Sequence, residues 1–234
     1  MDWPTIQRRP KILIGYSAVS ALLLGVYARA GLVPFHGPMV FDGFSEVPDL
    51  LPYTRAQLER VLFTAAPAGA LRPPPEWTTD APREDRAREL RPNPGWRWLR
   101  PGRARGPLLA ANLSAARTLA GTAYWPTFAD AILCVREVWL FLSDLQRIDQ
   151  SLTRLRLLGV LDQITGLVVG KLTDALGNDE RALEQLVLGQ GSHVATGPGR
   201  GTAGRHLPIL AGVDFGHTDS RPVLPLGVRA SLAS

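Results

Sequence analysis

Apolar residues along the chain form two kinds of stretch: short runs rich in β-branched residues, and longer segments with helical spacing. The first kind predicts strands at residues 11–16, 32–35, 108–111, 131–135, 164–170 and 207–211, with one or two more in 222–232. The second kind predicts helices at residues 18–30, 54–63, 144–158 and 179–188, and another that begins at Asn112. Strands and helices alternate, which predicts an α/β fold in both parts of the chain.

The composition changes near the middle of the chain. Residues 65–106 are rich in Pro, Gly and Arg and lack sustained periodicity, which is typical of a linker between domains. We therefore expect an N-terminal part over residues 1–64, a linker over 65–106 and a C-terminal domain over 107–234. With 45% hydrophobic and 20% charged residues, the 234-residue chain is expected to be globular.

The net charge of +5 comes mainly from arginine. Several arginines lie between Arg83 and Arg105, where acidic residues are interspersed and Trp77, Trp96 and Trp98 lie in or beside the run. Basic and aromatic residues together can bind single-stranded nucleic acid. A solvated arginine-rich loop is the interpretation we adopt, so no nucleic-acid partner is predicted.

The single cysteine, Cys134, excludes an internal disulfide and a metal site built from several cysteines. It lies in the apolar run 132–135, which predicts a buried core thiol. Histidines and carboxylates lack the spacing of metal ligands, so no metal site is expected.

Residues 12–28 carry no charge and follow three basic residues, a pattern similar to a signal peptide or an anchor helix. The stretch is short for a membrane span, and Gly15 interrupts it. A buried strand, a sharp turn and a helix ending at Gly31 fit the residues better. We therefore predict no membrane association.

The turn of this unit, Gly15-Tyr16-Ser17-Ala18-Val19, places a serine between a strand and the start of a helix. Such a turn exposes the hydroxyl and directs helix amides at an oxyanion forming beside it. Val19 stands where the nucleophile elbow of hydrolases has its second glycine. Ser17 is therefore a candidate nucleophile, and a simple helix N-cap is the alternative.

His217 is the second candidate for chemistry, in a loop over residues 212–220 between two apolar strands. A neutral imidazole there can accept the proton of a serine hydroxyl. Of the other histidines, His36 lies in a turn near Ser17, His193 in a glycine-rich loop, and His206 before a strand.

Residues 11–17 and 31–39 resemble the nucleophile region of the LD-carboxypeptidase and microcin-immunity family. Further segments resemble the family in the same order: 111–114, 121–124, 147–149, 155–160, 166–170, 214–218 and 224–228. Together they cover nearly the whole chain, which makes the resemblance far more specific than either motif alone.

The resemblance implies a flavodoxin-like nucleophile domain, here truncated, and a C-terminal α/β domain with a β-barrel-like sheet. It also implies a cytoplasmic homodimer without a cofactor. Family members use a Ser-His-Glu triad to release a D-amino acid from an L,D-peptide bond, as in murein tetrapeptides, and a minority cleave peptide-nucleotide antibiotics. Ser17 would then be the nucleophile, His217 its base, and a small muropeptide the partner.

The chain departs from the family in two places that bear on catalysis. Only sixteen residues precede Ser17, so part of the nucleophile domain is expected to be missing. Arg136 aligns with the catalytic acid, and Glu137 follows it. On a regular strand Glu137 faces the opposite side, so it completes the triad only if the strand end bulges. An inactive relative that binds muropeptides is the alternative that Arg136 favours.

Overall fold

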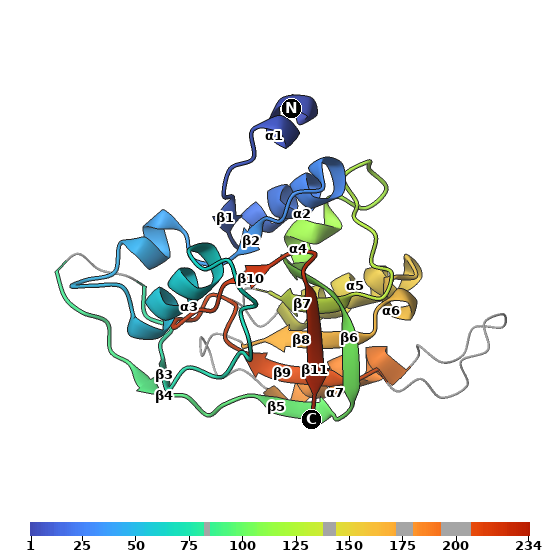
Figure 1. Ribbon diagram of the computed structural model, residues 1–234. Coiled ribbons are helices and arrows are strands. Elements are labelled where there is room, and N and C mark those ends of the chain that lie inside the picture. The colour runs from blue at the N-terminus through green and yellow to red at the C-terminus, as the bar shows by residue number, and fades with distance from the viewer. Residues whose placement is uncertain (82–84, 138–143, 172–179, 193–206) are drawn as a thin grey trace.

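The computed structural model of the protein describes residues 1–81, 85–137, 144–171, 180–192 and 207–234. Its strands are β1 (Ile14–Gly15), β2 (Phe35–His36), β3 (Glu76–Trp77), β4 (Arg91–Pro92), β5 (Arg97–Arg100), β6 (Arg103–Asn112), β7 (Ile132–Arg136), β8 (Gly166–Gly170), β9 (Ile209–Val213), β10 (Leu224–Pro225) and β11 (Arg229–Ala233). Its helices are α1 (Trp3–Arg8), α2 (Val19–Ala30), the π-helical turn η1 (Val40–Phe44), α3 (Pro52–Leu62), α4 (Leu113–Arg117), α5 (Asp144–Leu157), α6 (Val160–Gln163) and α7 (Glu180–Ser192). Figure 1 shows their arrangement.

The main element is a curled six-stranded sheet in the order β11-β6-β7-β8-β9-β5 (Figure 1). Strands β6 to β9 pair in parallel, and β11 and β5 close the two edges antiparallel. A small sheet, β1-β2-β10, lies beside it, and β3 pairs with β4. The predicted α/β class with a barrel-like sheet is confirmed.

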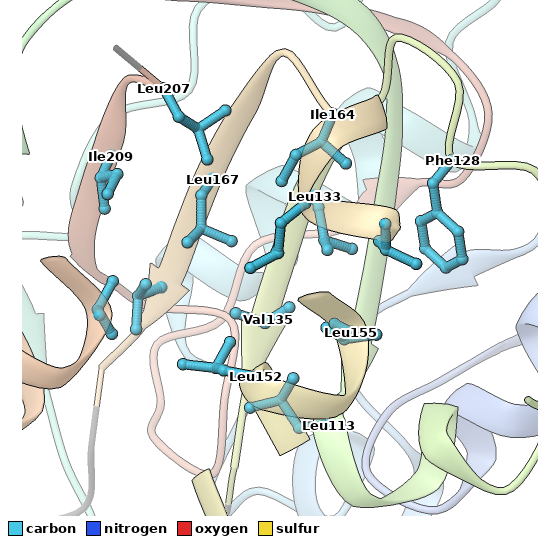
Figure 2. Packing of buried hydrophobic residues seen from close by; sticks show 14 of the residues in the cluster. Leu113, Phe128, Leu133, Val135, Leu152, Leu155, Ile164, Leu167, Leu207 and Ile209 are labelled. Carbon is cyan, nitrogen blue, oxygen red and sulfur yellow. The ribbon is translucent and has the colours of Figure 1, made fainter. Parts of the chain in front are cut away.

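Both faces of the large sheet are buried, as expected for parallel strands. On one face Leu133 and Val135 of β7 pack with Leu167 of β8 against Leu152 and Leu155 of α5, as Figure 2 shows. Burying one such leucine side chain contributes roughly 1.5–3 kcal/mol. This cluster therefore anchors the helices of the second half of the chain to the sheet.

The other face of the sheet packs against the N-terminal part of the chain. Ile132 and Cys134 of β7 contribute to this cluster together with Leu23 and Leu24 of α2. Burial raises the pKa of the Cys134 thiol to about 12, so the predicted core thiol is confirmed. Because α2 packs directly on the sheet, the turn that precedes it is held beside the strands of the second half.

Local signals located the end of α2 and the start of α4. Gly31 ends α2 with φ of +65°, and the Asn112 side chain caps α4 by accepting from the Ala115 amide at 2.9 Å. The helix predicted at residues 54–63 begins two residues earlier, at Pro52. Thr54 is buried, and its Oγ1 accepts from the Arg221 amide at 2.9 Å.

The range predicted as a linker contributes to the sheets. Strand β5 pairs with β9, and β3 pairs with β4. Arg88 is buried, which corrects the interpretation of a solvated segment for that residue, whereas Arg86, Arg91, Arg97, Arg103 and Arg105 are exposed as expected. The division of the chain at residues 64 and 106 stays a prediction.

The stretch at residues 12–28 forms the predicted strand, turn and helix. It contains β1 and most of α2, which has 12 residues. Within the ranges that the structure describes, no helix is long and apolar enough to cross a membrane.

Candidate active site

Ser17 lies at a sharp turn between β1 and α2, with a backbone φ of +56°. Residues with a side chain rarely adopt this left-handed conformation, and where they do, a functional site is frequently nearby. Gly15 makes the turn possible, because a Cβ there would lie 2.8 Å from Cγ1 of Val19. The backbone of this segment therefore has the geometry of a nucleophile elbow.

Ser17 is not the cap of α2. Ala18 occupies the cap position, and no hydrogen bond joins the Ser17 hydroxyl to any residue in the described ranges. The Val19 and Ser20 amides donate to Tyr16 and Ser17 carbonyls at 3.1 and 3.0 Å. The Ala18 amide, one residue after the candidate nucleophile, has no backbone acceptor there, and this is the amide that donates to the oxyanion in such elbows.

His217 lies next to this turn. Its ring centroid is 4.9 Å from that of Tyr16, the residue before Ser17. Its Nδ1 is buried and has no hydrogen-bond partner, and its Nε2 is 3.5 Å from Nη1 of Arg136. The structure thus brings the elbow and His217 together without a hydrogen bond between Ser17 and the imidazole. In unliganded sites catalytic hydrogen bonds are often long or misaligned.

Glu137, the third predicted residue, contacts the start of α4. Its Oε1 accepts from Nδ2 of Asn112 at 2.7 Å, and its Oε2 accepts from the amide and hydroxyl of Ser114 at 2.9 and 2.7 Å. Strand β7 pairs in regular register with β6 as far as Arg136, without the bulge that would turn Glu137 to the other face. The structure therefore does not bring Glu137 to His217.

We expect Glu137→Gln to act on stability rather than on chemistry. The amide removes one buried acceptor for Ser114, and losing a hydrogen bond to a charged group costs about 1–3 kcal/mol. The free energy of unfolding, measured in urea, should fall by this amount while kcat/KM changes only a few-fold. Glu59→Gln, at an exposed site on α3, is the control. A loss of kcat above about 100-fold at unchanged stability would contradict this assignment and favour a role in the triad.

Arg136 holds the position that the resemblance assigns to the acid. The residue is 2% exposed, and its Nη2 donates to the Glu137 carbonyl at 2.9 Å. Burial, together with the nearby Arg221, lowers the pKa of its guanidinium to about 9. Gly170 leaves room for this side chain, since a Cβ there would lie 2.9 Å from Cβ of Arg136.

A buried ionic network that the sequence did not predict supports the turn. Arg221 lies over the Tyr16 ring, with Cζ 3.8 Å from its centroid, and its Nη2 pairs with Asp219 at 3.2 Å. Asp219 also pairs with Arg88 at 2.9 Å, and Arg88 pairs with Glu46. These contacts tie the loop that carries His217 to distant segments of the chain, and the stacking positions Tyr16.

The two aspartates nearest to His217 in sequence are engaged elsewhere. Asp214 pairs with Lys171 at 2.7 Å and accepts from Asn93 at 2.9 Å and from Trp96 at 2.7 Å. Asp219 pairs with the two arginines of the network. Across the described part of the chain, neither nitrogen of the imidazole hydrogen-bonds to a carboxylate.

The remaining histidines do not extend the site. His193 and His206 lie outside the described residues. His36 is fully buried, with ring centroids of Tyr16 and Phe215 at 6.3 and 5.7 Å. Within the ranges that the structure covers, no three His, Cys, Asp or Glu side chains are grouped to hold a metal ion.

His36 makes stability depend on pH. Burial lowers its pKa from 6.5 to about 3, with further contributions from Arg136 and Arg221. Above pH 6.5 the His36 ring is neutral in both the folded and the unfolded chain, so the full free energy of unfolding is present there. This stability is lost as the pH falls toward 3, because the unfolded chain binds the proton first, at up to about 1.4 kcal/mol per pH unit.

We therefore expect urea unfolding at pH 7.5, 6 and 4.5 to show a steep loss of stability on acidification. His36→Phe keeps an aromatic ring and removes the titrating group, so it should flatten this dependence. Equal slopes in the two proteins would show that His36 is not the group responsible.

With this geometry established, the chain falls in the class of α/β proteins with a strand-turn-helix site. The sequence model of the LD-carboxypeptidase C-terminal domain matches residues 105–232, and that of the N-terminal domain matches residues 1–37. The chain belongs to the LD-carboxypeptidase family.

Individual relatives agree with this assignment. A carboxypeptidase-family protein of Vibrio cholerae is 29% identical over 238 residues, covering 99% of this chain and 66% of the relative. The microcin C7 self-immunity protein MccF of Escherichia coli is 28% identical over 244 residues, covering 99% and 65%. The chain therefore spans about two thirds of the length of the curated relatives it matches.

Solved structures give the same fold. An MccF-like protein from Bacillus anthracis superimposes with a TM-score of 0.82 at 25% identity, covering 100% of this chain and 68% of that one. MccF in complex with aspartyl sulfamoyl adenosine gives 0.81 at 26% identity, with the same coverage.

Proposed function

We propose that this chain carries the site of a serine carboxypeptidase that hydrolyses an L,D-peptide bond and releases a C-terminal D-amino acid from murein-type tetrapeptides. The observation that carries the proposal is the left-handed backbone of Ser17 at the elbow. The Ser17 hydroxyl attacks the scissile carbonyl, and His217 takes its proton and passes it to the leaving amine. The Ala18 amide donates to the oxyanion. Water then hydrolyses the acyl-enzyme.

The proposed enzyme is slow. Without a carboxylate on the imidazole, the orientation and charge of His217 are less well supported, and an amide in place of the triad carboxylate costs about 10⁴-fold in kcat in the serine protease template. Arg136 adds to this deficit, since a cation beside the imidazole disfavours the imidazolium that must form.

A second candidate is hydrolysis of a peptide-nucleotide conjugate. It is supported by the similarity to MccF, which has been solved with aspartyl sulfamoyl adenosine. The same Ser17 and His217 would act, so substrate choice distinguishes the two candidates and the elbow geometry does not.

A third candidate is a relative that binds muropeptides without cleaving them. The contact between Arg136 and His217 favours it, because a cation occupies the place expected for the acid. Binding in such a protein would not depend on the serine hydroxyl.

The deciding experiment supplies the purified chain with an L,D-tetrapeptide, its all-L counterpart and an aspartyl adenylate analogue with a cleavable bond, and follows product release. Release of D-alanine only from the first peptide supports the carboxypeptidase. Cleavage of the adenylate alone supports the second candidate. Peptide binding without release supports the third.

We extend the proposal to a cytoplasmic homodimer, which cell fractionation and sedimentation would test.

A further inference from the structure

Arg136 is a buried cation that forms no ion pair with a carboxylate in the described ranges, although the charges of Glu137 and Asp42 act to raise its pKa. Its Nη2 donates to the Glu137 carbonyl, and its Nη1 lies 3.5 Å from Nε2 of His217. Removing a charge from water is costly unless an opposite charge compensates it. Arg221 and Arg88, by contrast, are both paired with Asp219.

The unsatisfied groups lie together near His217. Nε of Arg136, Nδ1 of His217 and the hydroxyl of Thr218 are buried without a hydrogen-bond partner. Nε and Nη1 of Arg221 also lack a hydrogen bond, although Nη1 lies 3.7 Å from Asp42. Buried polar groups are normally satisfied by protein, water or a ligand, so this concentration of donors marks a place for an anion.

The backbone packs closely against the side of Arg136 where Nε has no partner. Gly216 faces it: a Cβ at that position would lie 3.1 Å from Nε and 3.4 Å from Cζ. Any side chain at residue 216 would therefore press on the guanidinium. Nε and one Nη of an arginine form the fork that binds a carboxylate through two parallel hydrogen bonds.

From these observations we propose that Arg136 binds the terminal carboxylate of the substrate peptide, with the nearby Arg221 adding positive potential. The inference rests on the proposed carboxypeptidase function. In a carboxypeptidase substrate the terminal carboxylate is one residue beyond the scissile carbonyl, so its cation must lie close to the base. Arg136 meets this requirement, since its Nη1 is 3.5 Å from Nε2 of His217.

Calorimetry on the Ser17→Ala variant tests the binding without turnover. The probes are an L,D-tetrapeptide with a free C-terminal carboxylate and the same peptide as its C-terminal amide. We expect the carboxylate form to bind at least about 10-fold more tightly, and Arg136→Gln in this background to remove the preference. Arg136→Lys, which keeps the charge and loses the fork, should retain part of it.

Equal affinity for the two peptides in the Ser17→Ala protein would overturn the proposal, as would an undiminished preference after Arg136→Gln. If Arg136→Gln fails to fold, the Arg136→Lys protein decides: an unchanged preference overturns the role of the fork. Turnover is measured separately with Ser17 intact. A preference for the carboxylate peptide without hydrolysis would contradict the proposed enzyme function but support the carboxylate site. Equal hydrolysis of the acid and the amide would support the enzyme function but contradict the carboxylate site.

Discussion

Replacing Ser17 by alanine is expected to abolish D-amino-acid release and to leave the fold intact. The substitution removes the atom that attacks the carbonyl, and loss of the nucleophile in serine peptidases costs at least about 10³-fold in kcat. Since the hydroxyl bonds to no residue in the described ranges, the free energy of unfolding should change little. Release from an L,D-tetrapeptide, followed by chromatography over hours, is the measurement.

Two further variants sharpen this test. Ser231→Ala changes an exposed serine on β11 and should keep the wild-type rate. His217→Ala should lose activity as Ser17→Ala does, because the two residues act as a unit and their effects are not additive. Release by Ser17→Ala at the wild-type rate would remove Ser17 as the nucleophile and leave the elbow without a catalytic explanation.

Features set by neighbouring residues were predictable from the sequence. The strand-turn-helix unit around Ser17 follows from a short apolar run, a glycine and an alanine-rich segment. The glycine at the end of α2 and the Asn112 cap of α4 follow from local backbone chemistry. Each of these depends on contacts within a few positions.

Features that depend on distant partners were not predictable in this way. Strand β5 has arginine at both ends and little apolar pattern, and it is a strand because β9, more than a hundred residues later, pairs with it. The pairing of Arg88 with Asp219 spans 131 residues, and nothing in either local segment indicates it. Thr54, in the first turn of α3, accepts from the amide of Arg221, which lies 167 residues later.

The candidate site contains both features that the local sequence predicts and features that depend on distant partners. Ser17 and His217 were named from local pattern and family resemblance. The contact of Arg136 with His217, and the engagement of Glu137 by Asn112 and Ser114, required the register of β7 in three dimensions. A one-residue difference along a strand decides which face a side chain takes, and the sequence leaves that choice open at a strand end.

Arg136→Glu is expected to raise kcat by about 10²–10⁴-fold, because a carboxylate then lies beside the imidazole. The carboxylate orients the ring and stabilises the imidazolium, and removing it from a complete triad costs about 10⁴-fold. A buried glutamate is tolerable there because Arg221 is nearby and because glutamate is shorter than the arginine that it replaces. Steady-state hydrolysis of the L,D-tetrapeptide over a range of concentrations gives kcat and KM separately.

Arg136→Gln is the matched control, because it removes the cation without adding an acid. If Arg136 binds the terminal carboxylate, both variants should raise KM, but only Arg136→Glu should raise kcat strongly. An unchanged kcat in Arg136→Glu would mean that the missing acid does not limit the chemistry. A rise of kcat and KM together in this variant, with KM alone rising in Arg136→Gln, would mean that one position serves substrate binding here and proton transfer in relatives that have the acid.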